Sequence, residues 1–74
     1  MATMYSSPST EVVKWNIFID GAAPGSLTFV QELDAAAESF SNLGDGVYEV
    51  VISEKALLPI TSAHGVALLK MEEM

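Results

Sequence analysis

The clearest periodic pattern of apolar residues lies between residues 11 and 20. Every second position there is apolar, and these positions are Val13, Trp15, Ile17 and Ile19. An alternation of period two, built from β-branched and aromatic side chains, is typical of a strand with one buried face. We therefore predict that residues 11–20 form a strand.

The next two segments favour a hairpin. Residues 20–26 contain Gly21, Pro24 and Gly25, the residue types that set the backbone angles of chain reversals. Residues 26–31 alternate again through Leu27 and Phe29. This pattern predicts a second strand, antiparallel to the first.

The apolar period changes at Glu32. From there the apolar residues follow the three-to-four spacing of one helical face: Leu33, Ala36, Ala37, Phe40 and Leu43. Gly44 stands where a left-handed residue commonly ends a helix. The spacing predicts a single helix over residues 32–43.

Three segments in the C-terminal half are predicted to be strands. Residues 47–53 alternate clearly. Residues 56–60 are assigned to an edge strand, because Pro59 lacks the N–H that an inner strand needs. Residues 66–71 are read as a strand that pairs with residues 56–60, although their helix propensity leaves a short helix as the alternative.

Together these elements predict one α+β domain over residues 11–74. Their order is β-β-α-β-β-(β), an antiparallel sheet with one helix packed on one face. Residues 1–10 are rich in Ser and Thr and have no apolar period. We expect them to form a flexible leader.

The charge of the chain restricts its partners. Among 74 residues, ten are acidic and three are basic, which gives a net charge of −7. Nucleic acids and anionic membranes are normally bound through Lys and Arg, so direct binding to either is disfavoured. No apolar run approaches the roughly 20 residues of a membrane span, and no secretory signal is recognised. We expect a cytoplasmic protein.

The sequence offers no catalytic, cofactor or metal site. His64 is the only histidine and there is no cysteine, so a metal-ligand set is missing. Ser62 lies close to His64 in the sequence, but that proximity does not supply the geometry of a nucleophile and its base. A polar loop explains these residues better than an active site.

Acidic residues in the middle of the chain are the candidate partner-binding group. Asp34 and Glu38 lie four apart in the predicted helix and would share one face of it. With their neighbours they would form an acidic ridge for a basic partner, and the alternative is a merely solvated face. The group comprises Glu32, Asp34, Glu38, Asp45 and Glu49.

The apolar C-terminal segments are a candidate oligomer interface. A small domain with one helix does not easily bury both faces of its strands, so some of these side chains would contact another molecule. The alternative is that they complete the core beneath the helix. The residues are Leu57, Leu58, Ile60, Leu68 and Leu69.

The succession of "VVKWNIFID", a glycine loop, "SLTFVQ", "ELDAAAESF" and "GVYEVVIS" resembles the element pattern of small phage-encoded proteins that inhibit host machinery. These include inhibitors of host RNA polymerase with a β-β-α-β core and acidic anti-CRISPR proteins. The resemblance covers residues 11–53 and no shared residue motif. It implies an inhibitor in the host cytoplasm that blocks a basic, nucleic-acid-binding surface by stoichiometric binding.

We therefore expect a non-enzymatic inhibitor that occludes a basic surface of a larger host protein or complex, with nucleic-acid mimicry as one form of this mechanism. The alternative is a structural or assembly protein that forms a homodimer or larger homo-oligomer through its C-terminal apolar strands.

Overall fold

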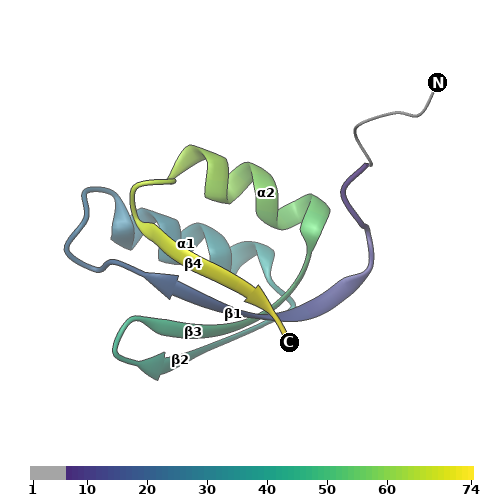
Figure 1. Ribbon diagram of the computed structural model, residues 1–74, viewed down its shortest axis with the longest axis horizontal. Helices are drawn as coiled ribbons and strands as arrows, with labels where there is room; N and C mark the ends of the chain where they lie inside the picture. The colour runs from purple at the N-terminus through teal and green to yellow at the C-terminus, as the bar shows by residue number, and fades with distance from the viewer. Residues whose placement is uncertain (1–6) are drawn as a thin grey trace.

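The computed structural model describes residues 7–74, which form a four-stranded sheet with two helices on one of its faces (Figure 1). The elements are β1 (Val12–Ile19), α1 (Ser26–Ala36), β2 (Ser39–Gly44), β3 (Val47–Ser53), α2 (Glu54–Ala63) and β4 (Leu68–Glu73). The strand order is β2-β3-β1-β4, and all neighbouring strands are antiparallel. This β-α-β-β-α-β arrangement is the split β-α-β, or ferredoxin-like, topology.

The predicted α+β class and antiparallel sheet are confirmed. The strand predicted over residues 11–20 is β1, and the one predicted over residues 47–53 is β3. Residues 68–71 lie in β4, so the strand interpretation is correct for that part of residues 66–71. The predicted pairing with residues 56–60 is wrong, because β4 pairs with β1. The order of elements differs from the predicted β-β-α-β-β-(β), however. The structure has two helices, α1 between β1 and β2 and α2 between β3 and β4.

The first helix begins earlier than its apolar spacing indicated. Residues 26–31, predicted to be a strand, form the first half of α1. Phe29 and Leu33 are fully buried while Leu27 is 69% exposed, so Leu27 and Phe29 do not share a face as they would in a strand. Burial of two residues four apart is the helical pattern.

The helix ends at Ala36 because Ala37 has an extended backbone. Phe40 and Leu43 belong to β2 instead.

The hairpin of this fold lies between β2 and β3, not at residues 20–26, which connect β1 to α1. Its turn residues are Asp45 and Gly46, with φ angles of 54° and 79°. Two positive φ angles in a two-residue Asp-Gly loop are the type I′ geometry, whose twist matches that of the paired strands. The turn also joins the hairpin to β1, since the N–H of Ile19 donates to the carbonyl of Gly46 at 2.8 Å.

The edge strand predicted over residues 56–60 is wrong, because this segment lies within α2. Ser53 caps the helix by accepting a hydrogen bond from the N–H of Ala56 at 3.2 Å. Pro59 lies inside the helix, on its exposed side. Leu57 and Thr61, four residues apart, are buried, and this packing of one helix face, together with the Ser53 cap, outweighs the N–H that Pro59 lacks.

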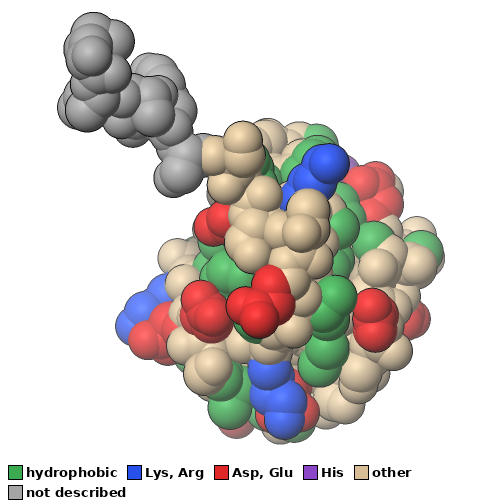
Figure 2. Space-filling view, turned by 90° about the vertical axis from the view of Figure 1, so that its right-hand side faces the viewer, with side chains coloured by type: hydrophobic (Ala, Val, Ile, Leu, Met, Phe, Trp, Pro, Cys, Tyr) green, Lys and Arg blue, Asp and Glu red, His purple; other side chains and the backbone are tan. Residues whose placement is uncertain are grey.

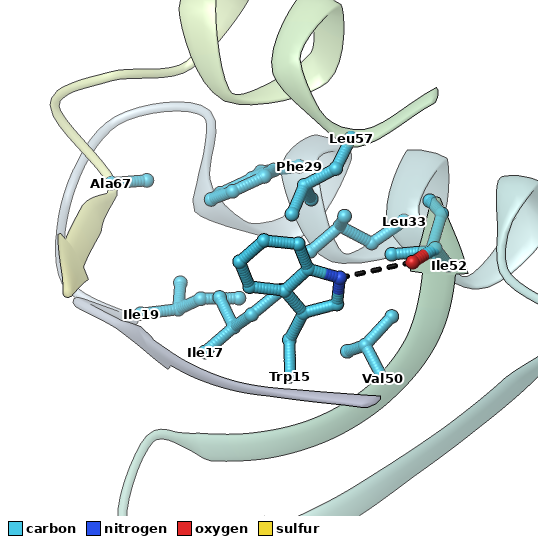
Figure 3. Close-up of a cluster of buried hydrophobic side chains, with 9 residues drawn as sticks. All are labelled: Trp15, Ile17, Ile19, Phe29, Leu33, Val50, Ile52, Leu57 and Ala67. Atoms are coloured by element: carbon cyan, nitrogen blue, oxygen red, sulfur yellow. Dashed lines mark hydrogen bonds between the residues drawn. The ribbon is translucent and has the colours of Figure 1, made fainter. Parts of the chain in front are cut away.

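The core lies between the sheet and the two helices. Trp15 projects from β1 toward Leu33 and Leu57, and its Nε1 donates to the carbonyl oxygen of Ile52 at 2.9 Å (Figure 3). The whole core comprises Trp15, Ile17, Ile19, Phe29, Leu33, Val50, Ile52, Leu57 and Ala67. Because both helices pack on the same face, the other face of the sheet stays uncovered.

Most of the leader predicted over residues 1–10 lies outside the described residues. Residues 7–10 form no regular element. Ser9 is nevertheless fixed to the start of α2: its N–H donates to Glu54 Oε1 at 2.9 Å, and its carbonyl accepts from the N–H of Lys55 at 3.0 Å.

We predict that Gly46→Ala destabilises the fold by about 2 kcal/mol, which lowers Tm by about 10 °C in a domain of this size. A β-carbon at this position would lie 2.7 Å from the carbonyl oxygen of Ile19, at a φ of +79°. Gly21→Ala is the matched control, because a β-carbon there meets nothing within 4 Å. Thermal unfolding of both variants is the measurement, and equal Tm values would contradict this description of the turn.

Candidate functional site

The structure separates the five acidic residues predicted to bind a partner. Glu32 and Asp34 lie in α1, Glu38 lies between α1 and β2, Asp45 is in the hairpin turn, and Glu49 is in β3. The prediction that Asp34 and Glu38 share one helix face is wrong, because α1 ends at Ala36, before Glu38. No single helical ridge therefore exists.

Four of these five residues nevertheless surround strand β2. Glu38 immediately precedes β2, Asp45 immediately follows it, and Glu49 is the register partner of Ser41 in β2. The fourth is Asp34, whose position on α1 follows from the helix period.

The helix period places Glu32 and Asp34 on opposite flanks of α1. Successive residues are about 100° apart, so these two lie on either side of the buried Leu33. Glu32 faces α2, because its carboxylate lies 3.1 Å from Nε2 of His64, the residue that follows α2. Asp34 lies on the other flank with Val30, which is four residues before it and lines a groove with Tyr48 of β3. Asp34 thus belongs to the β2 side of the molecule.

The three basic residues are Lys14, Lys55 and Lys70. Lys55 is exposed in the first turn of α2 and has no ion pair among residues 7–74. Lys14 and Lys70 lie on the uncovered face of the sheet, where Lys14 Nζ is 4.0 Å from Glu49 and Lys70 Nζ is 3.5 Å from Glu72. Glu49 is therefore partly neutralised by Lys14. By contrast, Asp34, Glu38 and Asp45 are exposed and have no ion pair among residues 7–74.

Strand β2 is an edge of the sheet with unusually little protection. Its sequence, SFSNLG, contains neither a charged residue nor a proline. The opposite edge, β4, carries Lys70, Glu72 and Glu73. Edge strands expose unpaired N–H and C=O groups, and proteins usually protect such edges with charges or prolines. Within its own sequence, β2 is protected by its short length and by a register shift between Asn42 and Gly44.

A mostly apolar groove of about 240 Å³ lies near this edge, on the helix side of the sheet. Its lining residues are Ile19, Gly21, Ser26, Leu27, Val30 and Tyr48. The ring of Tyr48 is 5.3 Å from that of Phe40 in β2, measured between centroids. The groove thus continues into the side chains of the edge strand, and Leu43 at the end of β2 is 58% exposed.

His64 links the two helices. Besides its contact with Glu32, its ring stacks on Phe29 with centroids 5.5 Å apart. Sequence reasoning placed His64 in a polar loop and did not find Glu32 as its partner, because 32 positions separate them and no local pattern connects them. This geometry gives His64 a packing role between α1 and α2.

A second cavity, of about 230 Å³, lies at the end of the molecule where β1 begins. Figure 2 views this end and shows acidic side chains near its centre. The lining residues are Ser9, Glu11, Val13, Trp15, Glu54 and Glu73. Its three glutamates come from segments far apart in the chain, so no local sequence pattern groups them. Within residues 7–74, no group of three or more His, Cys, Asp or Glu side chains is placed to hold a metal ion.

The residues predicted to form an oligomer interface mostly contribute to the core. Leu57 is fully buried, whereas Leu69 is 67% exposed. Leu58, Ile60 and Leu68 are half-buried, and Ile60 and Leu68 pack against the core cluster. The interpretation that this segment completes the core is therefore correct for Leu57, which is inaccessible to a second chain in the folded domain.

No protein family, curated protein or solved structure matches this chain. None of the helices described in residues 7–74 is long and apolar enough to span a membrane.

We predict that Leu57→Ala lowers the free energy of unfolding by about 3 kcal/mol, because it opens a cavity in the core. Leu69→Ala, the exposed counterpart, should change it by no more than about 0.5 kcal/mol. Urea unfolding of both variants measures the difference. A large loss for Leu69 and a small one for Leu57 would mean that the C-terminal segment is stabilised by contacts outside the core.

Proposed function

We propose that this protein acts by binding: its β2 side engages a Lys- or Arg-bearing surface of a larger protein in the cytoplasm and occludes it. The observation that carries the proposal is the separation of charge. Asp34, Glu38 and Asp45 are exposed and unpaired within residues 7–74, whereas Lys14 and Lys70 pair with carboxylates on the uncovered sheet face. These three carboxylates are thus free of ion pairs within residues 7–74 and open to a basic partner.

Electrostatics also favours this class of partner over others. A chain of net charge −7 repels the phosphates of nucleic acids and of anionic membranes, whereas it attracts basic protein surfaces and accelerates encounter with them. A basic surface that normally holds nucleic acid is one target with this chemistry, and covering it would make the protein an inhibitor. Binding without catalysis is sufficient for such an effect.

The resemblance to phage-encoded inhibitors adds no support, because it is based on a β-β-α-β layout that differs from the observed β-α-β-β-α-β order. The homo-oligomer alternative is weakened because the side chain of Leu57, one of its proposed contacts, is enclosed in the core. The proposal rests on the charges around β2.

The test uses a labelled peptide of about eight residues, with Lys at each end and alternating Thr and Val between them. We expect binding that weakens about tenfold as salt is raised from 0.1 to 1 M, because about two exposed ion pairs are screened. Fluorescence anisotropy measures the dissociation constant. Affinity for the peptide that does not change with salt would contradict the proposed function, because contact with exposed carboxylates is electrostatic.

Charge reversal locates the site. The double variant Asp34→Lys with Glu38→Lys should weaken peptide binding at least about tenfold, since two attractive contacts become repulsive. The matched control is Glu72→Lys with Glu73→Lys, which changes the net charge by the same amount at the opposite edge, in β4. We expect the control to remain within about twofold of the unmodified protein, because charges that far apart are screened at physiological salt. Equal losses in both variants would mean that only total charge matters.

A further inference from the structure

We propose that the partner binds as a fifth strand: an extended segment of the partner pairs with the free edge of β2 and carries a Lys or Arg at each end. This inference rests on the proposed function and specifies its binding mode. It goes further because a basic surface of any shape would satisfy charge attraction, whereas strand addition requires an extended backbone in register with β2.

The two edges of the sheet differ in their fitness for this role. An added strand gains its affinity from main-chain hydrogen bonds and its specificity from alternate side chains. The β4 edge presents Lys70, Glu72 and Glu73, charged side chains that discourage strand pairing. The β2 edge presents Ser39, Ser41 and Asn42, all uncharged and exposed. Strand β2 is therefore the edge that accepts a partner.

The acids define the length and charge of that partner segment. The six residues of β2 span about 20 Å at roughly 3.3 Å per residue. Glu38 and Asp45 lie immediately beyond its two ends, and both are exposed. An added strand of similar length would bring a basic residue at each of its own ends next to one of these carboxylates. Asp34, on the flank of α1 toward β2, adds a third negative charge on the helix side.

The side-chain environment also favours an extended segment with apolar residues. Side chains of an added strand that point to the helix side would lie beside Phe40, which is half-buried and touches Tyr48. Tyr48 in turn lines the groove of about 240 Å³ with Leu27 and Val30. Apolar side chains at alternate positions of the partner fit this side, while those on the uncovered face would be polar.

A second copy of this chain is a poorer occupant of the edge. In an antiparallel pair of β2 strands, Glu38 of each copy would lie near Asp45 of the other. In a parallel pair, equivalent acids would lie together. Like charges placed opposite each other across strands are destabilising, and neither residue forms an ion pair within the part of the chain that the structure describes. Charge complementarity thus selects a basic partner instead of self-association.

Backbone methylation of the peptide probe tests the binding mode. In an added strand, alternate N–H groups point toward β2 and the others point to solvent. One peptide is N-methylated at its odd inner positions and another at its even inner positions, with the lysines retained. We expect one of the two sets to bind about a hundredfold more weakly, since about three hydrogen bonds are lost, and the other to bind within about threefold of the unmodified peptide.

A peptide with Glu in place of both lysines is the charge control, and its binding should be at least about tenfold weaker. If both methylated peptides bind as well as the unmodified one and salt still weakens binding, strand addition is wrong while the proposed function stands. If both methylated peptides lose binding equally, strand addition is also wrong, because pairing with one strand edge requires the N–H groups of only one of the two methylated sets.

Sedimentation of the protein alone tests whether a second copy of this chain binds at the β2 edge. We expect a monomer at micromolar concentration. A dimer that the Lys-ended peptide dissociates would show that a second copy occupies β2, and would overturn the proposal. Absence of any peptide binding at low salt would overturn strand addition, because an extended basic segment would then have no site at β2.

Discussion

The packing of Phe29, Leu33 and Leu57 against the inner face of β1 and β3 determines which surfaces of this protein are free. These three side chains are fully buried, and they fix both helices on one side of the sheet (Figure 3). The strand order then leaves β2 and β4 as edges. An open four-stranded sheet with both helices on one side keeps two strand edges and one uncovered face, so the chemistry of these exposed surfaces governs how the protein meets other molecules.

Charge is distributed unequally over the exposed surfaces. The uncovered face carries two lysines and the two glutamates that pair with them, so its local charge is balanced. The β2 side carries Asp34, Glu38 and Asp45 around an uncharged strand. An edge strand without protective charges in its own sequence is a hazard for aggregation. In the proposed binding mode, acids at both of its ends oppose self-pairing and attract a segment of opposite charge, so the same residues serve both effects.

The sequence predicted the α+β class, the antiparallel sheet, β1, β3 and the strand character of β4, because each strand has a clear apolar alternation or a hairpin-like context. The prediction failed for residues 26–31, where the apolar residues fit both the two-residue period of a strand and the period of a helix. Leu27 and Phe29 fit an alternation, whereas Phe29 and Leu33 fit a helix, and only burial in the folded domain distinguishes them. The Asp45-Gly46 dipeptide directly before the alternating segment 47–53 was the better hairpin signal, and it indicates a strand on its N-terminal side, where β2 lies.

The candidate site was predictable only in part. The acids Asp34, Glu38 and Asp45 were selected from the sequence on charge alone, but their relation to one another depends on β2 being a strand at the sheet edge. The contact between His64 and Glu32 and the cavity beside Trp15 join residues distant in the chain. No local pattern reports such pairings, because they result from the docking of α2 and from the order of strands in the sheet.

Amide hydrogen exchange with and without the Lys-ended peptide tests the central claim most directly, because it reports which backbone N–H groups become protected. Binding of an extended basic segment at β2 predicts slower exchange in Ser39–Gly44 and unchanged exchange in Leu68–Glu73. Protection confined to β4, or spread evenly over the surface, would contradict the account.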